Sequence, residues 1–103
     1  MSVLMEFAMF PTDKGESVSA YVSKVIDAIR QSGCNYKLTA MGTIIETDTV
    51  EKALQIIQKA YDTLEPVSNR IYSSVKFDIR KNTTQRLEGK IASIEKKIGK
   101  TNH

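Results

Sequence analysis

The chain of 103 residues has few of the residue types on which several protein functions depend. Its single cysteine, Cys34, excludes an internal disulfide and a cysteine-based metal cluster. Its only histidine, His103, stands at the end of the sequence, where we expect a frayed backbone and no catalytic role. No metal-ligand spacing and no glycine-rich phosphate loop occurs. We therefore expect no metal, no cofactor and no enzymatic activity.

Long apolar runs are also missing. No run approaches the roughly 18 residues that a membrane-spanning helix needs. The residues from Met1 to Glu6 lack the basic region of a signal peptide. A lone cysteine suits a reducing compartment. The sequence therefore predicts a cytoplasmic protein with no membrane partner.

Positive charge is only in slight excess, at +3. Much of that excess falls between residues 88 and 100, where four lysines accompany two glutamates. Such mixing is typical of a solvated helix face rather than of a nucleic-acid interface. An RNA-binding sheet would also need stacking aromatics on its central strands, and the run around Ile44 has none. We expect no nucleic-acid partner.

What the chain does have is an ordinary globular composition, with 41% hydrophobic and 26% charged residues. A chain of this length buries roughly two-thirds of its unfolded surface when it folds. No linker or low-complexity segment divides it. We expect one domain that spans residues 1–103.

Alternating apolar residues predict four strands. Residues 2–10 alternate until Pro11, which cannot donate to a strand ladder. The run Tyr36 to Glu46 is typical of a β-hairpin around Ala40-Met41-Gly42, in which Gly42 is expected to take a positive φ. Residues 70–80 form the last strand, with one apolar and one charged face.

Apolar residues at helical spacing predict two helices between the strands. The first covers Val18 to Ser32, with Ser17 as its N-cap and Gly33 as the left-handed residue after its end. The second covers residues 49–65, where Asp48 and the glutamate three residues later form a capping box.

A third helix is expected near the end of the sequence, with Thr83 or Thr84 as its cap. Its apolar residues form a narrow seam of the kind that packs on another helix. This seam suits either contacts between subunits or docking on the chain's own sheet.

The element order predicts an α+β fold, the ferredoxin-like βαββαβ sandwich with an additional C-terminal helix. Its strand order is 4-1-3-2, and we expect the first and third strands to be adjacent and parallel. The helices cover one face of the sheet, and Glu6 and Glu46 share the open face with Lys76. The two carboxylates suit either an acid/base pair or an ion-paired sheet surface.

The open face is expected to bind a ligand. It offers carboxylates, the hydroxyls of Thr39 and Thr43, the Ser17 and Ser19 hydroxyls at a helix start, and aliphatic walls. A carboxylate would be costly there without a polar partner. A few convergent polar groups in an apolar setting suit a small, flat, nitrogen-rich or cationic ligand.

Several motifs together resemble the small thiamine-binding protein family of ferredoxin-like fold. They are Met1-Ser2-Val3 with Glu6 and Pro11, the Ser17-Val18-Ser19 helix start, the hairpin Tyr36-x-Leu38-x-x-Met41-Gly42-Thr43-x-Ile45-Glu46, and Asp78-x-Arg80. The resemblance covers essentially the whole chain, and the Met-Gly-Thr-x-Ile-Glu segment is its most specific part. Thr47 departs from the glycine that is frequent there in the family, which changes the expected loop shape.

The resemblance implies a non-enzymatic protein that binds thiamine or its hydroxymethylpyrimidine moiety and assembles as a homotetramer, a dimer of dimers. It also implies a ligand-binding set, in which Glu46 and Thr43 lie nearest the aminopyrimidine and Met41 forms an apolar wall. The full set is Ser17, Ser19, Thr39, Met41, Gly42, Thr43, Ile44 and Glu46.

Two alternatives belong to other functional classes. The open face would be only an oligomer interface if the protein is a structural or interaction module. An enzyme of thiamine metabolism would need the glutamate pair to act as acid and base.

Overall fold

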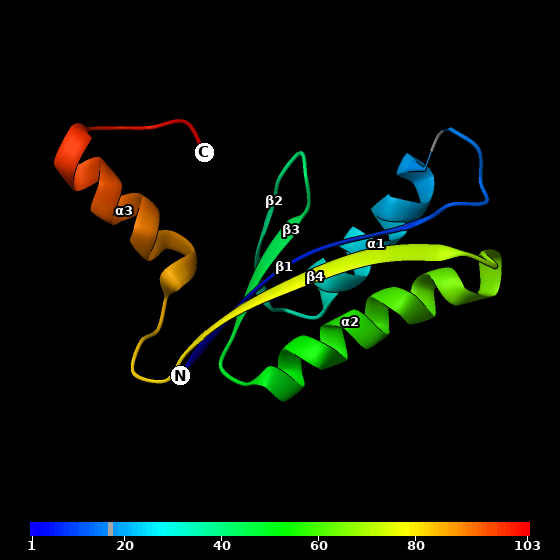
Figure 1. Cartoon of the computed structure of the whole chain (residues 1–103), viewed down its shortest axis with the longest axis horizontal. Coiled ribbons are helices and arrows are strands. Elements are labelled where there is room, and N and C mark those ends of the chain that lie inside the picture. Colours follow the sequence, from blue (N-terminus) through cyan, green and yellow to red (C-terminus); the bar gives the residue numbers. More distant parts are fainter. Residues whose placement is uncertain (17) are drawn as a thin grey trace.

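The computed structural model describes residues 1–16 and 18–103 (Figure 1). Its elements are β1 (Ser2–Pro11), α1 (Ser19–Gln31), β2 (Asn35–Leu38), β3 (Thr43–Thr47), α2 (Val50–Leu64), the short 3-10 helix η1 (Glu65–Val67), β4 (Ile71–Arg80) and α3 (Arg86–Ile98). This order is βαββαβ with an additional C-terminal helix, which confirms the α+β fold class.

The four strands form one sheet in the order β2-β3-β1-β4, which is the expected order counted from the other edge. Strand β1 pairs antiparallel with both β3 and β4, so the expectation of parallel first and third strands is wrong. The strand that follows each crossover helix runs in the same direction as the strand before that helix, whereas the β2–β3 hairpin reverses the direction of the chain. Strand β3 therefore runs opposite to β1.

Helices α1 and α2 lie on one face of the sheet and enclose the core (Figure 1). Because side chains alternate along a strand, the odd-numbered residues of β1 and β3 enter this core and the even-numbered ones face the other way. The buried residues are Val3, Met5, Phe7, Met9, Val25, Ile29, Ile45, Ala53, Ile56, Ala60 and Leu64. The even-numbered face of the sheet is the open face.

The two crossover helices end close to the expected positions. Gly33 follows α1 with φ +77°, as the left-handed role predicted for it requires. Helix α2 is capped by Thr49, whose hydroxyl accepts a hydrogen bond from the Lys52 N–H at 3.1 Å. The capping box assigned to Asp48 is therefore wrong by one residue, and Asp48 instead pairs with the Lys52 ammonium group at 2.9 Å.

Helix α3 stands beyond the end of the sheet at which the chain begins, away from α1 and α2 (Figure 1). Only its first turn docks: Leu87 is 6% exposed, whereas Ile98 is 74% exposed. In the part of the chain that the structure describes, no helix is long and apolar enough to span a membrane.

Candidate functional site

The β2–β3 hairpin turns through Ala40 and Met41 and is closed by the Thr39 side chain. The Thr39 hydroxyl donates to the Gly42 carbonyl at 2.8 Å and accepts from the Met41 and Gly42 N–H groups at 3.3 and 3.2 Å. This is the local side-chain turn that Ser and Thr favour. The hydroxyl of Thr39 is thus used within the turn, and Met41 projects from its tip with 88% of its surface exposed.

Gly42 does not have the positive φ that was expected of it. Among the described glycines, positive φ values occur only at Gly15, Gly33 and Gly99. The reason for glycine at position 42 is instead a close approach, because a Cβ atom there would lie 3.0 Å from the Phe7 carbonyl oxygen. The hairpin therefore packs its backbone directly against the central strand β1.

Beneath this turn lies a cleft of about 280 Å³, which we call the hairpin cleft. It is formed between the hairpin, the second half of β1 and the inner side of α1. Its lining is largely apolar: Phe7, Ala8, Met9, Phe10, Val22, Val25, Ile26, Leu38, Thr39, Ala40, Met41, Gly42 and Thr43. Four of the residues expected to bind ligand, namely Thr39, Met41, Gly42 and Thr43, thus come together here.

Thr43 supplies the polar group of the hairpin cleft. Thr43 is only 4% exposed and lies on the side of β3 that faces the helices, opposite Phe7 of β1. Among the residues that line the cleft, Thr43 is the buried polar one. Its hydroxyl is therefore the polar group that we expect a guest in the cleft to meet.

The expectation that Thr43 shares the open face with Glu46 is wrong. The two residues are three apart on one strand, and an odd separation places side chains on opposite faces. Glu46 lies across from Leu4, and Ile44 across from Glu6, all on the open face. The hairpin cleft and the carboxylates are therefore separated by the thickness of the sheet.

The serines at the start of α1 were also expected at the site. Ser17 lies outside the described residues. Ser19 lines a neighbouring groove of about 530 Å³ between α1 and β2. This groove shares Val22, Ile26 and Leu38 with the hairpin cleft, so the two hollows are adjacent.

Glu46 caps α3. Its carboxylate accepts hydrogen bonds from the backbone N–H groups of Arg86 at 2.8 Å and Leu87 at 3.0 Å, and from the Ser2 hydroxyl. Gln85 precedes the helix in a left-handed conformation and supplies no side-chain cap. The caps expected from Thr83 or Thr84 are therefore wrong, since the first turn of α3 is satisfied by a residue 40 positions earlier.

Arg86 completes this anchor from the helix side. Its guanidinium group donates to the Ser2 hydroxyl at 3.0 Å, to the Ser2 carbonyl at 2.9 Å and to the Asp78 carboxylate at 2.8 Å. We call the cluster of Ser2, Glu46, Asp78 and Arg86 the α3 anchor. Burial raises the pKa of Glu46, but the Ser2 hydroxyl, the two backbone N–H groups and the Arg86 charge outweigh it and hold that pKa below its ordinary value of 4.5.

The second carboxylate of the open face, Glu6, is paired differently. It lies opposite Lys76 on β4, with the carboxylate oxygen 3.9 Å from the ammonium nitrogen. Both glutamates thus share one face as expected. Each has its own partner, an arrangement that matches the alternative of a paired sheet surface.

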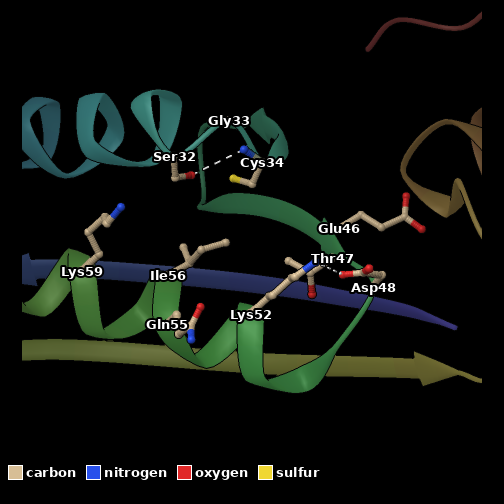
Figure 2. A pocket seen from close by; sticks show the side chains of 10 residues that line it. All are labelled: Ser32, Gly33, Cys34, Glu46, Thr47, Asp48, Lys52, Gln55, Ile56 and Lys59. Carbon is tan, nitrogen blue, oxygen red and sulfur yellow. Dashed lines mark hydrogen bonds and ion pairs between the residues drawn. The ribbon is translucent and has the colours of Figure 1, made fainter.

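A larger cleft of about 680 Å³ opens on the helix side, between the end of α1 and the first half of α2 (Figure 2). Figure 2 shows Lys59 and Ile56 rising from α2 toward Ser32 and Cys34. Its charges are mixed, because Asp48 lines it together with Lys52 and Lys59. Across the described residues, no three His, Cys, Asp or Glu side chains gather into a possible metal site.

Comparison with known proteins identifies the family. A family model described as thiamine-binding protein matches residues 5–95, most of the chain. The chain belongs to the thiamine-binding protein family. The UPF0045 protein of Mycobacterium bovis is 32% identical over 96 residues, which cover 93% of this chain and 94% of that protein. The UPF0045 protein of Methanocaldococcus jannaschii is 34% identical over 92 residues, which cover 89% and 91%.

Solved structures share the fold of this family member. A hypothetical protein from Methanocaldococcus jannaschii aligns with a TM-score of 0.81 at 32% identity, over 90% of this chain and 95% of that one. A Thermotoga maritima protein named for thiamine biosynthesis or salvage aligns with a TM-score of 0.78 at 16% identity, over 91% and 99%. The name of the family indicates a small-molecule-binding role.

Proposed function

We propose that this protein binds thiamine or its hydroxymethylpyrimidine moiety, without chemical conversion, and that the pyrimidine ring enters the hairpin cleft. The observation that carries the proposal is Thr43, a polar residue that is only 4% exposed and that lines a largely apolar hollow. Support also comes from the name of the family and from that of the Thermotoga maritima neighbour.

The shape and chemistry of the cleft suit one flat ring. Its volume of about 280 Å³ is at the lower end of small-molecule sites, which run from about 300 to 1,000 Å³. Phe7, Val25 and Ile26 offer apolar contact to the faces of a ring, and the Thr43 hydroxyl both donates and accepts. A ring nitrogen or an exocyclic amine is the natural partner of that hydroxyl.

The remainder of thiamine would leave the hairpin cleft along the groove between α1 and β2. This groove is adjacent to the cleft, and Ser19 and Ser23 are among the residues that line it. In this arrangement Ser19, Thr39, Met41, Gly42 and Thr43 belong to the site. Glu46 and Ile44 lie on the opposite face of β3 and are not part of it.

Thr43→Val tests the proposed contact, because valine keeps the shape of threonine and removes the hydroxyl. We expect affinity for hydroxymethylpyrimidine, measured by isothermal titration calorimetry, to fall about tenfold, the value of one lost hydrogen bond. Glu46→Gln, on the other face, should leave that affinity unchanged. The reverse outcome, with loss in Glu46→Gln and none in Thr43→Val, would move the site to the open face.

We further propose that the protein works as a homotetramer and that strand β4 contributes to the contacts. In the described chain β4 pairs only with β1, so its outer edge is free over ten residues. The strand itself carries the exposed apolar residues Val75, Phe77 and Ile79, and an exposed apolar edge strand favours pairing with another strand. Native mass spectrometry should report four subunits, and Ile79→Lys should shift the distribution toward smaller species. A monomer at micromolar concentration would contradict this arrangement.

The proposed setting is the cytoplasm, where the free thiol of Cys34 would remain reduced. An interaction module without a ligand is the competing function, favoured by the partners that both open-face glutamates already have. The absence of any heat with thiamine and hydroxymethylpyrimidine at millimolar concentration would favour that module.

A further inference from the structure

Another hollow lies between α3 and the open face of the sheet. After its first turn α3 leaves the sheet, and a cleft of about 570 Å³ opens between the helix and strands β1 and β4. We call it the α3 cleft. It is lined by Leu4, Asp78, Arg80, Thr83, Thr84, Gln85, Arg86, Gly89, Lys90, Ser93 and Ile94. None of these residues lines the hairpin cleft.

The α3 cleft has an excess of positive charge that the protein does not neutralise. The Arg86 charge is matched by Asp78 and Glu46 in the α3 anchor. Arg80 and Lys90 also line the cleft, and within residues 1–16 and 18–103 neither forms an ion pair. Glu88, the other carboxylate at the start of α3, pairs with Lys37 at 2.8 Å. The positive charges of Arg80 and Lys90 therefore remain available to a bound anion.

The remaining polar groups of the cleft can all donate hydrogen bonds. The hydroxyls of Thr83, Thr84 and Ser93 and the Gln85 amide line it, while Leu4 and Ile94 add apolar contact. Cations together with several hydroxyl and amide donors are the groups that bind phosphate oxygens. The uncommitted groups of the α3 cleft thus match an anion with several acceptor oxygens.

The backbone of the cleft supports a binding role independently of charge. Gln85 has φ 56°, the only positive φ of a non-glycine residue in the described ranges. Such a conformation costs about 1–3 kcal/mol and is concentrated at ligand sites and switches. Gln85 lines the cleft, and the α3 anchor holds the chain beside it, because Glu46 accepts a hydrogen bond from the next N–H group.

From these observations we infer that the α3 cleft binds a phosphate group, either as the free ion or as part of a small organic phosphate. Arg80 and Lys90 supply the charge, and Thr83, Thr84 and Ser93 supply directional donors. This site lies across the sheet from the hairpin cleft and does not depend on the function proposed above.

The test is a titration of the full-length protein with inorganic phosphate, followed by amide chemical shifts in NMR at constant ionic strength. We expect saturable shifts confined to the lining of the cleft, namely Leu4 and residues 78–94. Arg80→Gln combined with Lys90→Gln should weaken binding at least about tenfold. Lys96→Gln combined with Lys97→Gln removes the same charge from the exposed surface of α3 and should leave binding unchanged.

Each result has a defined meaning. The site is established if the shifts saturate and only the double variant at Arg80 and Lys90 abolishes them. Tighter binding of an organic phosphate would show that the apolar walls of the cleft also contact the ligand. Shifts that do not saturate, that spread over all lysine-bearing surfaces or that persist in the Arg80 and Lys90 variant would overturn the inference. Thermal melting of both double variants verifies that they remain folded.

Discussion

Gly42→Ala is expected to destabilise the protein by about 1–3 kcal/mol, the usual cost of forcing an extra carbon into a packed site. The new Cβ atom would lie 3.0 Å from the Phe7 carbonyl oxygen. That oxygen belongs to the backbone of β1, the strand paired on both sides in the sheet, so it cannot move aside readily. The hairpin must shift instead, and the hairpin cleft must change shape with it.

Chemical denaturation measures the stability change, and the same variant should lose affinity for hydroxymethylpyrimidine. Gly89→Ala is the matched control: Gly89 lies within α3, and a Cβ atom there would have nothing within 4 Å. Alanine should stabilise that helix by up to about 1 kcal/mol. If Gly42→Ala unfolds at the same denaturant concentration as the unmodified protein, the close approach at Phe7 is not a constraint.

Glu46→Ala should release α3 from the sheet. The substitution removes the acceptor for two backbone N–H groups and the Ser2 hydroxyl, and it leaves Arg86 with one carboxylate fewer. Loss of a helix cap alone costs about 0.5–2 kcal/mol, and a charged acceptor raises the cost. Hydrogen exchange should show faster exchange at the Arg86 and Leu87 amides. Glu88→Gln, which removes an exposed ion pair of α3, should have little effect.

The same anchor has a pH dependence with a defined sign. Because the pKa of Glu46 in the folded protein lies below 4.5, the folded state favours the charged carboxylate. Its contribution to stability is complete above the unfolded pKa and is lost as the pH falls through the lower, folded pKa. The protection of the Leu87 amide, which is its exchange rate compared with the intrinsic rate at the same pH, should therefore decrease below about pH 4.5 in the unmodified protein. In Glu46→Gln that decrease should be absent, and its persistence would assign the transition to another group.

Local sequence patterns predict most of the fold. The spacing of apolar residues locates α1, α2 and the strands, and Gly33 marks the end of α1 by its own conformational freedom. The antiparallel arrangement of β1 and β3 also follows from the element order, since one hairpin between two crossovers reverses the chain. The placement of Thr43 follows from its odd separation from Glu46.

Other features depend on contacts between distant residues and leave no local signal. The cap of α3 comes from Glu46, and no spacing rule connects residue 46 with residue 86. Glycine is needed at position 42 because of Phe7, which lies on another strand. The motif that resembles the family therefore combines two separate roles, with Gly42 and Thr43 at the hairpin cleft and Glu46 at the α3 anchor.

A crystal structure of the protein grown with hydroxymethylpyrimidine tests the central proposal most directly. We predict that the ring lies beneath the hairpin, between Phe7 and α1, with a nitrogen within hydrogen-bond distance of the Thr43 hydroxyl. A ring bound on the open face beside Glu6 or Glu46, with the hairpin cleft empty, would contradict it.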